Sequence, residues 1–394
     1  MRMKSPPGRA TPLPAPAGSR ARGAARRRLS VSSVVVGAAM VLVATAACSS
    51  GKSSSSSAVD PADASKVVSL TLGMAAPSAG QPCVFWAQAE NVFTRLGLKL
   101  SISPQGSSEP ALAAAGELVI GANTITQSYP PILAGRDIVH VYAQTVGNPS
   151  DAITVRANSS YNNVMDLSGQ TVGVVGTSGY SYGGAVLYSR YIVKNGGKPL
   201  NIVVQPDQNT LTAQLVNGKI AAAVFPPVFG PQISAGILKQ ILSAKSALSA
   251  SLNGKGMINS TFWGLQSTVS KNSVAITRLV AACRIADAQM QSLTADQIAA
   301  VLGKTSAFAP SVISQSALST EIEQSWIGFQ PGDQGYITEG GWKTSLSVFA
   351  SLGITDNGKP YNVSDPLFDY SDRVDMSYWN AATPIVTAYL AKYK

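Results

Sequence analysis

Residues 171–180 have the sequence TVGVVGTSGY, and this stretch decides the fold class. Its first half is short, apolar and rich in valine, which is typical of a buried strand. A loop with two glycines follows, and residues 180–194 then have the spacing of a helix that ends before a pair of glycines. A strand that leads through a tight loop into a helix is the first part of a βαβ unit.

The same alternation continues on both sides of this stretch. It predicts further strands at 67–73, 98–103, 118–120, 138–144, 202–205 and 221–225, and helices at 84–96, 127–133 and 210–216. Strands separated by helices form largely parallel sheets, and ligands of such sheets bind beyond the carboxyl ends of the strands. After residue 265 the pattern is helical, with helices predicted at 274–293, 294–302, 319–327 and 342–352.

The net charge of the chain comes mainly from its N-terminus. The 394 residues include 30 Lys and Arg and 20 Asp and Glu, for a formal charge of +10. Residues 1–47 contain eight of the basic residues and no acidic one, which leaves 22 basic and 20 acidic residues in the rest of the chain. A body with a charge of about +2 lacks the basic surface that nucleic acid requires, so we expect no nucleic-acid partner.

The residue inventory excludes several kinds of site. The chain has one histidine, His140, and three cysteines, so it cannot form a histidine-rich metal site or a four-cysteine zinc site. We therefore expect no metal and no cofactor. A Ser-His-Asp hydrolase would have to use His140, which lies in a predicted strand and is interpreted as structural.

The N-terminus has the order of a secretory signal. Arg26-Arg27-Arg28 precedes the apolar run 34–47, which is shorter than the ~20 residues of a membrane-spanning helix. The run ends in Thr45-Ala46-Ala47-Cys48, which resembles the lipobox of bacterial lipoproteins. The resemblance implies that 1–47 is a signal peptide and that Cys48 is lipidated. A plain signal peptide followed by an incidental cysteine is the alternative.

A serine-rich segment follows the cysteine. Residues 48–65 include the run Ser53 to Ser57, and such a composition behaves as a flexible tether. A tether behind a lipid anchor would let a folded domain stand away from the outer face of the cell membrane. We therefore expect an extracytoplasmic, membrane-anchored lipoprotein.

Several motifs resemble one known family in the order that the family has them. They are FWAQ at 85–88 with RLGLKL at 95–100, DLSGQTVGV at 166–174, LVNGKIAA at 215–222 and DRVDMSY at 372–378. The chain is similar to the solute-binding proteins of ABC importers of the nitrate/sulfonate/taurine type, with the related thiamine-precursor (NMT1/THI5-like) binders. The family usually has Asp where Glu117 and Ala221 stand, which leaves the substrate open.

The resemblance implies a two-lobed, periplasmic-binding-protein-like (type 2) α/β fold, in which each lobe is a mostly parallel sheet flanked by helices. Lobe one would comprise 66–155 and 263–394, and lobe two 156–262. A small organic molecule or oxyanion would bind between the lobes, shift the hinge toward the closed state and be delivered to ABC permease and ATPase subunits. We expect a monomer that performs no chemistry.

The candidate ligand contacts lie in loops after strands and beside them, and few are charged. Trp86 and Tyr180 are aromatic residues that can sandwich a planar ligand, although core packing explains Trp86 equally well. The loop before the helix at 180 presents free N–H groups, although it can equally be a plain tight turn. We predict a neutral or weakly charged small ligand over a dianion. The candidates are Ser78, Gln81, Trp86, Asn123, Thr124, Thr177, Ser178, Gly179, Tyr180, Phe225 and Thr261.

Two alternatives concern cysteines and function. Cys83 and Cys283 should both lie in lobe one and either form a disulfide or remain separate buried thiols. An enzyme of thiamine-pyrimidine synthesis on the same fold would consume an active-site histidine, for which only His140 is available. A surface sensor without a transporter is the third possibility.

Overall fold

The computed structural model describes residues 59–146, 152–176, 180–225, 229–243, 246, 248, 257–325, 333–351, 355–356, 359–360, 362 and 364–393. All of them belong to one compact unit, Ser57–Lys394. The predicted signal peptide, Cys48 and the first part of the tether lie outside the described residues. Within the described part of the chain, no helix is both long and apolar enough to cross a membrane.

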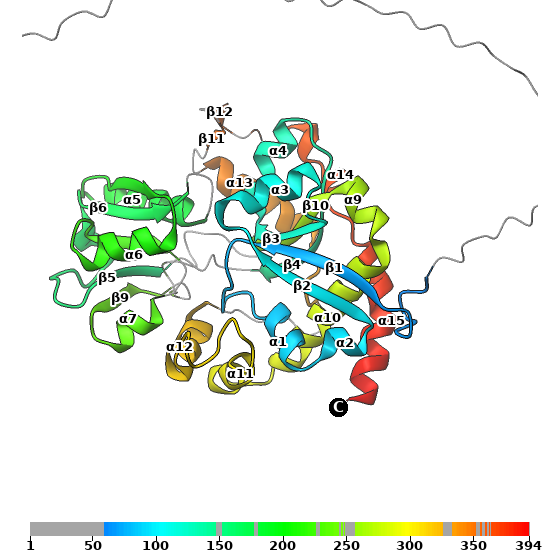
Figure 1. The fold of residues 1–394 in the computed structure, drawn as a ribbon. Helices are drawn as coiled ribbons and strands as arrows, with labels where there is room; N and C mark the ends of the chain where they lie inside the picture. The colour runs from blue at the N-terminus through cyan, green and yellow to red at the C-terminus, as the bar shows by residue number, and fades with distance from the viewer. Residues whose placement is uncertain are drawn as a thin grey trace, which may run out of the picture. The chain divides into compact units, whose positions relative to one another are not determined.

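The first sheet has five strands in the order β2-β1-β3-β10-β4 (Figure 1). β1 is parallel to β2 and β3, whereas β10 is antiparallel to both of its neighbours. Because β10 lies between β3 and β4, four of the five strands point the same way. The strands are β1 Val68–Met74, β2 Leu98–Pro104, β3 Ile120–Thr124, β4 Ile138–Val146 and β10 Ile258–Leu265.

The second sheet repeats this arrangement in the order β7-β6-β8-β5-β9. β6 is parallel to β7 and β8, and β5 is antiparallel to β8 and β9. In each sheet the antiparallel strand is the first strand after the chain crosses from the other sheet, since β5 comes after β4 and β10 after β9. The strands are β5 Ala152–Arg156, β6 Thr171–Val175, β7 Asn201–Gln205, β8 Ala222–Phe225 and β9 Leu238–Leu242. The predicted two-lobed α/β fold class is confirmed.

Alternating side chains of the first sheet enter two cores. Leu70, Leu72 and Met74 lie two residues apart on β1 and therefore share one face, where they pack against α1 and α10. Ile138 and Trp263 belong to a second cluster with the helices α3, α4 and α13. The elements of lobe one before β10 are α1 Cys83–Ala89, α2 Val92–Arg95, η1 Gly106–Ser108, α3 Glu109–Ala115, η2 Ile125–Ser128 and α4 Tyr129–Leu133.

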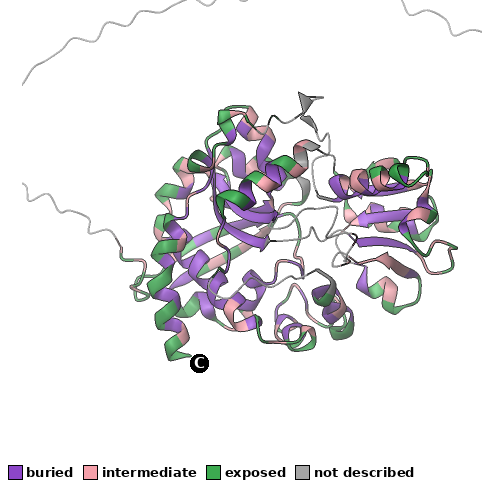
Figure 2. Ribbon diagram, turned by 180° about the vertical axis from the view of Figure 1, so that it is seen from behind, coloured by how far each residue is buried: buried purple, intermediate pink, exposed green. Residues whose placement is uncertain are grey.

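The chain after β10 completes lobe one with helices. Figure 2 shows that the strands are mainly buried, whereas the flanking helices alternate between buried and exposed faces. α10 packs against both α1 and α15. The elements are α9 Gln266–Lys271, α10 Ser273–Met290, α11 Ala295–Leu302, α12 Gln315–Ser325, α13 Glu339–Ser351, β11 Thr355–Asp356, β12 Lys359–Pro360, η4 Pro366–Phe368, α14 Tyr370–Arg373 and α15 Ser377–Lys392.

The second sheet carries helices on both faces. Val172 and Val174 of β6 pack against α5 Tyr180–Lys194, which presents Ala185, Tyr188 and Ile192 at helical spacing. The opposite face contacts α6 Gln208–Val216 and α7 Gly230–Ser234, and η3 Val164–Leu167 precedes β6. The strand at 171–175 and the helix at 180–194 have the predicted bounds.

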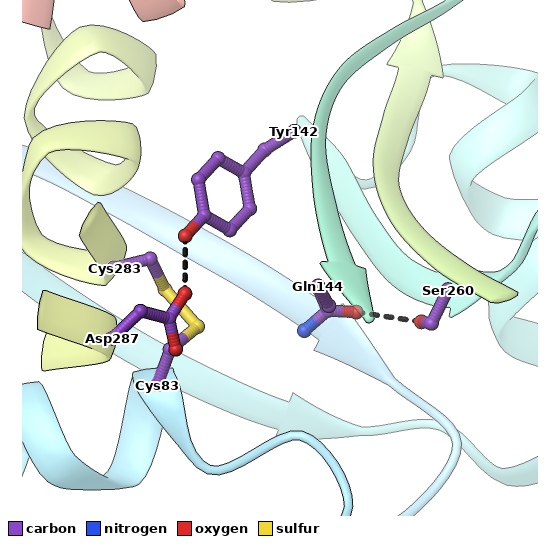
Figure 3. The surroundings of a disulfide bond; sticks show 6 residues. All are labelled: Cys83, Tyr142, Gln144, Ser260, Cys283 and Asp287. Atoms are coloured by element: carbon purple, nitrogen blue, oxygen red, sulfur yellow. Dashed lines mark hydrogen bonds between the residues drawn. A yellow bond between two sulfur atoms is a disulfide. The ribbon is translucent and has the colours of Figure 1, made fainter. Parts of the chain in front are cut away.

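A disulfide ties α1 to α10. It joins Cys83 and Cys283, which are 200 residues apart in sequence, and both are buried (Figure 3). Beside it, Tyr142 donates a hydrogen bond from its hydroxyl to the Asp287 carboxyl at 2.5 Å. Burial raises the pKa of Asp287 to about 8, so this carboxyl resists ionisation.

One buried arginine fixes the start of the described chain to lobe one. Arg278 of α10 donates hydrogen bonds to the main-chain carbonyls of Pro61, Asp63, Lys66 and Gly97 at 2.6–3.0 Å. Its guanidinium therefore provides hydrogen bonds to main-chain carbonyls of the segment before β1 and of Gly97. Pro61 and Asp63 belong to the predicted tether 48–65, so the last part of that segment is held against α10 and does not behave as a flexible tether.

The predicted helix 84–96 is interrupted in the structure. Asn91 adopts a left-handed conformation with φ 55°, which divides the segment into α1 and α2. Asparagine tolerates this region better than most residues, so the break is compatible with helical spacing on both sides.

Candidate ligand-binding site

The loops at the carboxyl ends of the strands surround one cavity of about 220 Å³. Both sheets contribute to it, as expected for the ends of parallel strands. The lining from the side of the first sheet is Ala75, Ala76, Pro77, Ser78, Gly80, Gln81, Ala122, Asn123, Thr124, Gln127, Thr145 and Asn259, and the lining from the side of the second sheet is Val175, Ser181, Gln208 and Phe225. The volume is below the ~300–1,000 Å³ typical of drug-sized ligands and fits a smaller molecule.

The loop between β1 and α1 forms one wall of this cavity. Ser78 Oγ accepts a hydrogen bond from the Gly80 main-chain N–H at 3.2 Å, which stabilises the turn. Gln81 Nε2 donates to Ser260 Oγ at 2.7 Å, and Ser260 donates in turn to Gln144 Oε1 at 2.8 Å or to the Asn123 carbonyl at 3.0 Å. Ser260, which is itself bonded to Gln144 (Figure 3), therefore holds the amide of Gln81 in place.

The end of β3 supplies two further side chains. Asn123 is 6% exposed; its Nδ2 donates to the buried Glu109 carboxyl, and its Oδ1 accepts from the Thr124 main-chain N–H at 2.8 Å. Thr124 Oγ1 donates to Gln127 Oε1 at 2.8 Å. Burial raises the pKa of Glu109 to about 7, and the hydrogen bond from Asn123 opposes this rise.

The strands next to the crossings between the lobes also reach the cavity. Thr145 belongs to β4 and Asn259 to β10. Thr145 is 9% exposed, and its Oγ1 has no hydrogen-bond partner among the described residues. A buried hydroxyl without a partner is costly unless a ligand or water completes it.

Lobe two contributes the opposite wall. Val175 and Phe225 are the last residues of β6 and β8, and Ser181 and Gln208 lie in the first turns of α5 and α6. Phe225 provides the one aromatic ring among the described lining residues. The wall therefore combines an apolar surface with two polar groups.

The structure brings together five of the predicted contacts, namely Ser78, Gln81, Asn123, Thr124 and Phe225. Residues Thr177, Ser178 and Gly179 lie outside the described residues, and so does the side chain of Tyr180.

Two other predicted contacts do not reach the cavity. Trp86 is 5% exposed, and its indole N–H donates to Gln289 Oε1 at 3.0 Å, so it packs in the core between α1 and α10. Thr261 is fully buried and contacts the ring of His140 through its Oγ1 at 2.8 Å. Thr261 lies two residues further along β10 than Asn259, beyond the irregular register at Ser260, and its hydroxyl contacts His140 in the core.

Sequence reasoning missed Gln127, Thr145, Ser181, Gln208 and Asn259. Gln208 follows a predicted strand, so the strand-end rule that selected Asn123 would also have selected this residue. Thr145 directly follows the predicted strand 138–144, so the same rule would have selected it as well. Asn259 gave no such signal, because it lies at the start of β10, where the chain returns to the first sheet.

His140 is enclosed in lobe one. Its side chain is fully buried, Nδ1 lies 2.8 Å from Thr261 Oγ1 and Nε2 lies 3.0 Å from Ser128 Oγ. Burial, with a smaller contribution from Arg373, lowers the pKa of His140 to about 3, so the ring is neutral. The ring is absent from the described cavity lining, which agrees with the structural role expected for it.

Two lobes with related strand orders and a cavity at the strand ends define the periplasmic-binding-protein fold. The chain belongs to the NMT1/THI5-like family, whose model matches residues 82–286. No curated protein sequence matches it.

Solved structures show the same fold at low sequence identity. The alkanesulfonate-binding protein SsuA of Xanthomonas axonopodis pv. citri, bound to MOPS, has a TM-score of 0.56 at 14% identity, covering 75% of this chain and 96% of its own. The nitrate-binding protein NrtA of Synechocystis PCC 6803 has a TM-score of 0.61 at 11% identity, and the match covers 81% of this chain and 89% of that protein. The desulfurization enzyme DSZB has a TM-score of 0.51 at 13% identity, and the match covers 80% of this chain and 99% of that protein. These similarities establish the fold.

Proposed function

We propose that the chain is an extracytoplasmic solute-binding protein that captures a small molecule in this cavity and delivers it to an ABC importer. The observation that carries the proposal is the cavity itself, which residues of both sheets line at their strand ends. A ligand that contacts both lobes favours the closed state and gives a permease a surface to recognise. The names of the sulfonate- and nitrate-binding neighbours support the same role.

Membrane attachment is part of the proposal. The sequence around Cys48 supports lipidation of this cysteine after removal of 1–47, with 48–65 as the tether, lobe one at 66–155 and 263–394, and lobe two at 156–262. Replacing Cys48 by Ala should release the protein from the membrane fraction into the medium. Retention of the C48A protein on the membrane would contradict the anchor.

The enzyme alternative receives less support from the structure. The chemistry that consumes a histidine needs an accessible ring, and His140 is enclosed by Thr261 and Ser128. The desulfurization enzyme DSZB has a similar fold, and this similarity is the observation that favours the enzyme alternative. Ligand-dependent stabilisation without turnover favours the receptor, and any product formed by the pure protein would refute it.

The test is to identify the molecule that the purified protein retains. Mass spectrometry of the denatured protein should show one small compound, and adding it back to stripped protein should raise the melting temperature. Gln208→Ala should weaken this binding, whereas Gln291→Ala, at an exposed position after α10, is the matched control. Equal effects of the two substitutions would place the ligand elsewhere.

A further inference from the structure

We infer that the cavity takes an uncharged ligand that both donates and accepts hydrogen bonds, and that Glu109 positions Asn123 for this recognition. The inference rests on the proposed function, because it assumes that the cavity is the solute site. It differs from the sulfonate and nitrate named for two structural neighbours.

No ionisable side chain is among the described residues that line the cavity. The polar groups there are hydroxyls and five carboxamides, which are Gln81, Asn123, Gln127, Gln208 and Asn259. An oxyanion removed from water needs a cation or several converging N–H groups, since an unpaired buried charge is strongly disfavoured. Carboxamides provide donors and acceptors in equal measure, which suits amides, hydroxyls and uncharged heterocycles.

The hydrogen bonds behind the lining leave both kinds of group available. Gln81 uses its Nε2 on Ser260, so its Oε1 remains an acceptor. Gln127 uses its Oε1 to accept from Thr124, so its Nε2 remains a donor. Thr145 Oγ1 is buried at the cavity without a partner in the described structure and can take either role. A ligand with one donor and one acceptor therefore finds complementary groups.

Glu109 lies behind this lining as a buried acid. Its side chain is fully buried, and its carboxyl accepts from Asn123 Nδ2. The other oxygen, Oε1, has no partner in the described part of the chain. Asn123 also accepts from the Thr124 N–H, so its amide plane is fixed from two sides. The carboxyl thus decides which edge of the Asn123 amide faces the cavity.

The fold makes room for this acid. A Cβ at Gly121 would overlap the Glu109 carboxyl, and a Cβ at Gly73 would lie 3.2 Å from its Cγ. The two glycines and Asn123 lie against this side chain, and none of the three is ionisable. A buried carboxyl in such surroundings has a raised pKa and repels an anion whenever it is ionised. An uncharged ligand avoids this repulsion.

The ligand class can be tested with pairs of probes that share a skeleton. Nicotinamide and nicotinate, benzamide and benzoate, and ethanesulfonamide and ethanesulfonate differ mainly in charge, and nitrate and taurine complete the panel. We expect the uncharged member of at least one pair to bind at least tenfold more tightly at pH 8 by calorimetry. An anion that binds as tightly as its uncharged partner overturns the inference and leaves the receptor proposal intact. A panel in which no uncharged probe binds also counts against the inference.

The role of Glu109 has a readout that needs no ligand. In ¹⁵N-labelled protein, the side-chain amide signals of Asn123, assigned by their loss in Asn123→Ala, should shift with pH around a midpoint near 7. Glu109→Gln should abolish this titration while the protein stays folded, and Glu117→Gln, an exposed acid, should preserve it. The positioning role is refuted if the Asn123 signals do not change with pH in the wild type, or if they titrate in Glu109→Gln as they do in the wild type. Neither result bears on whether a solute is transported.

Discussion

The disulfide between Cys83 and Cys283 allows a prediction of stability. Removing it in a C83A/C283A protein should lower the free energy of unfolding of lobe one. The bond joins the first residue of α1 to the middle of α10, and both residues are buried in the same core. Alanine is chosen because it leaves no polar group in that core, although it removes some packing.

The magnitude follows from the length of chain that the bond closes. A separation of 200 residues gives a loop-entropy contribution of about 5 kcal/mol in the unfolded state. Lobe two lies inside this loop. If lobe two stayed folded while lobe one unfolded, roughly half of the loop would still be flexible, and the logarithmic dependence on length would lower the contribution by only about 0.5 kcal/mol. We therefore expect a loss of about 3–5 kcal/mol.

The assay is urea unfolding followed by tryptophan fluorescence. Trp86 lies on α1 and Trp263 on β10, so both report on lobe one. Wild-type protein reduced with a phosphine and measured under the same conditions is the control, because it retains both cysteines. It should lose a similar amount, and a difference between reduced wild type and variant measures the lost packing. A loss below about 1 kcal/mol in reduced protein would refute the loop argument.

Three further predictions follow from buried polar groups. Burial keeps Asp287 protonated in the folded state, whereas the unfolded chain releases this proton. The free energy of unfolding should therefore fall as the pH rises from about 4 to 8. In urea titrations, D287N should make this dependence on pH less steep. Arg278→Ala should cost about 2–4 kcal/mol in the same assay and speed tryptic cleavage at Lys66; Arg278→Lys, with fewer donors, should not restore stability. Gly121→Ala should destabilise by about 1–3 kcal/mol, and adding Glu109→Ala should recover part of the loss; strictly additive effects would show that the two do not contact.

The sequence was informative where one local pattern controls the structure. The strand at 171–175 and the helix at 180–194 could be predicted to the residue, because apolar content and glycine punctuation agree there. The interruption at Asn91 could not, since helical spacing persists on both sides of a single left-handed residue. The helix α15 also escaped prediction, because it contains Pro384 and aromatic residues that weaken its helical signal.

Part of the site could be predicted by the same reasoning. Asn123 and Phe225 lie at the carboxyl ends of buried strands, and the strand-end rule locates them without knowledge of tertiary structure. Trp86 could not be assigned from the sequence, because an aromatic residue in the first turn of a helix can pack in the core or line a binding site. In the structure it packs in the core. The buried Glu109 was also beyond reach, since its burial depends on two glycines in strands that are distant in sequence.

The two sheets share a strand order in which the antiparallel strand follows a crossing from the other lobe. Thr145 and Asn259 lie on β4 and β10, beside the places where the chain leaves lobe one and returns to it. A ligand that bonds to these residues would therefore contact the strands on which the lobes turn, as well as the loops of each lobe. Hinge motions are concentrated in a few residues at the ends of elements, so contacts there convert binding energy into closure. In the proposed receptor, these two residues would link recognition in the cavity to closure of the lobes.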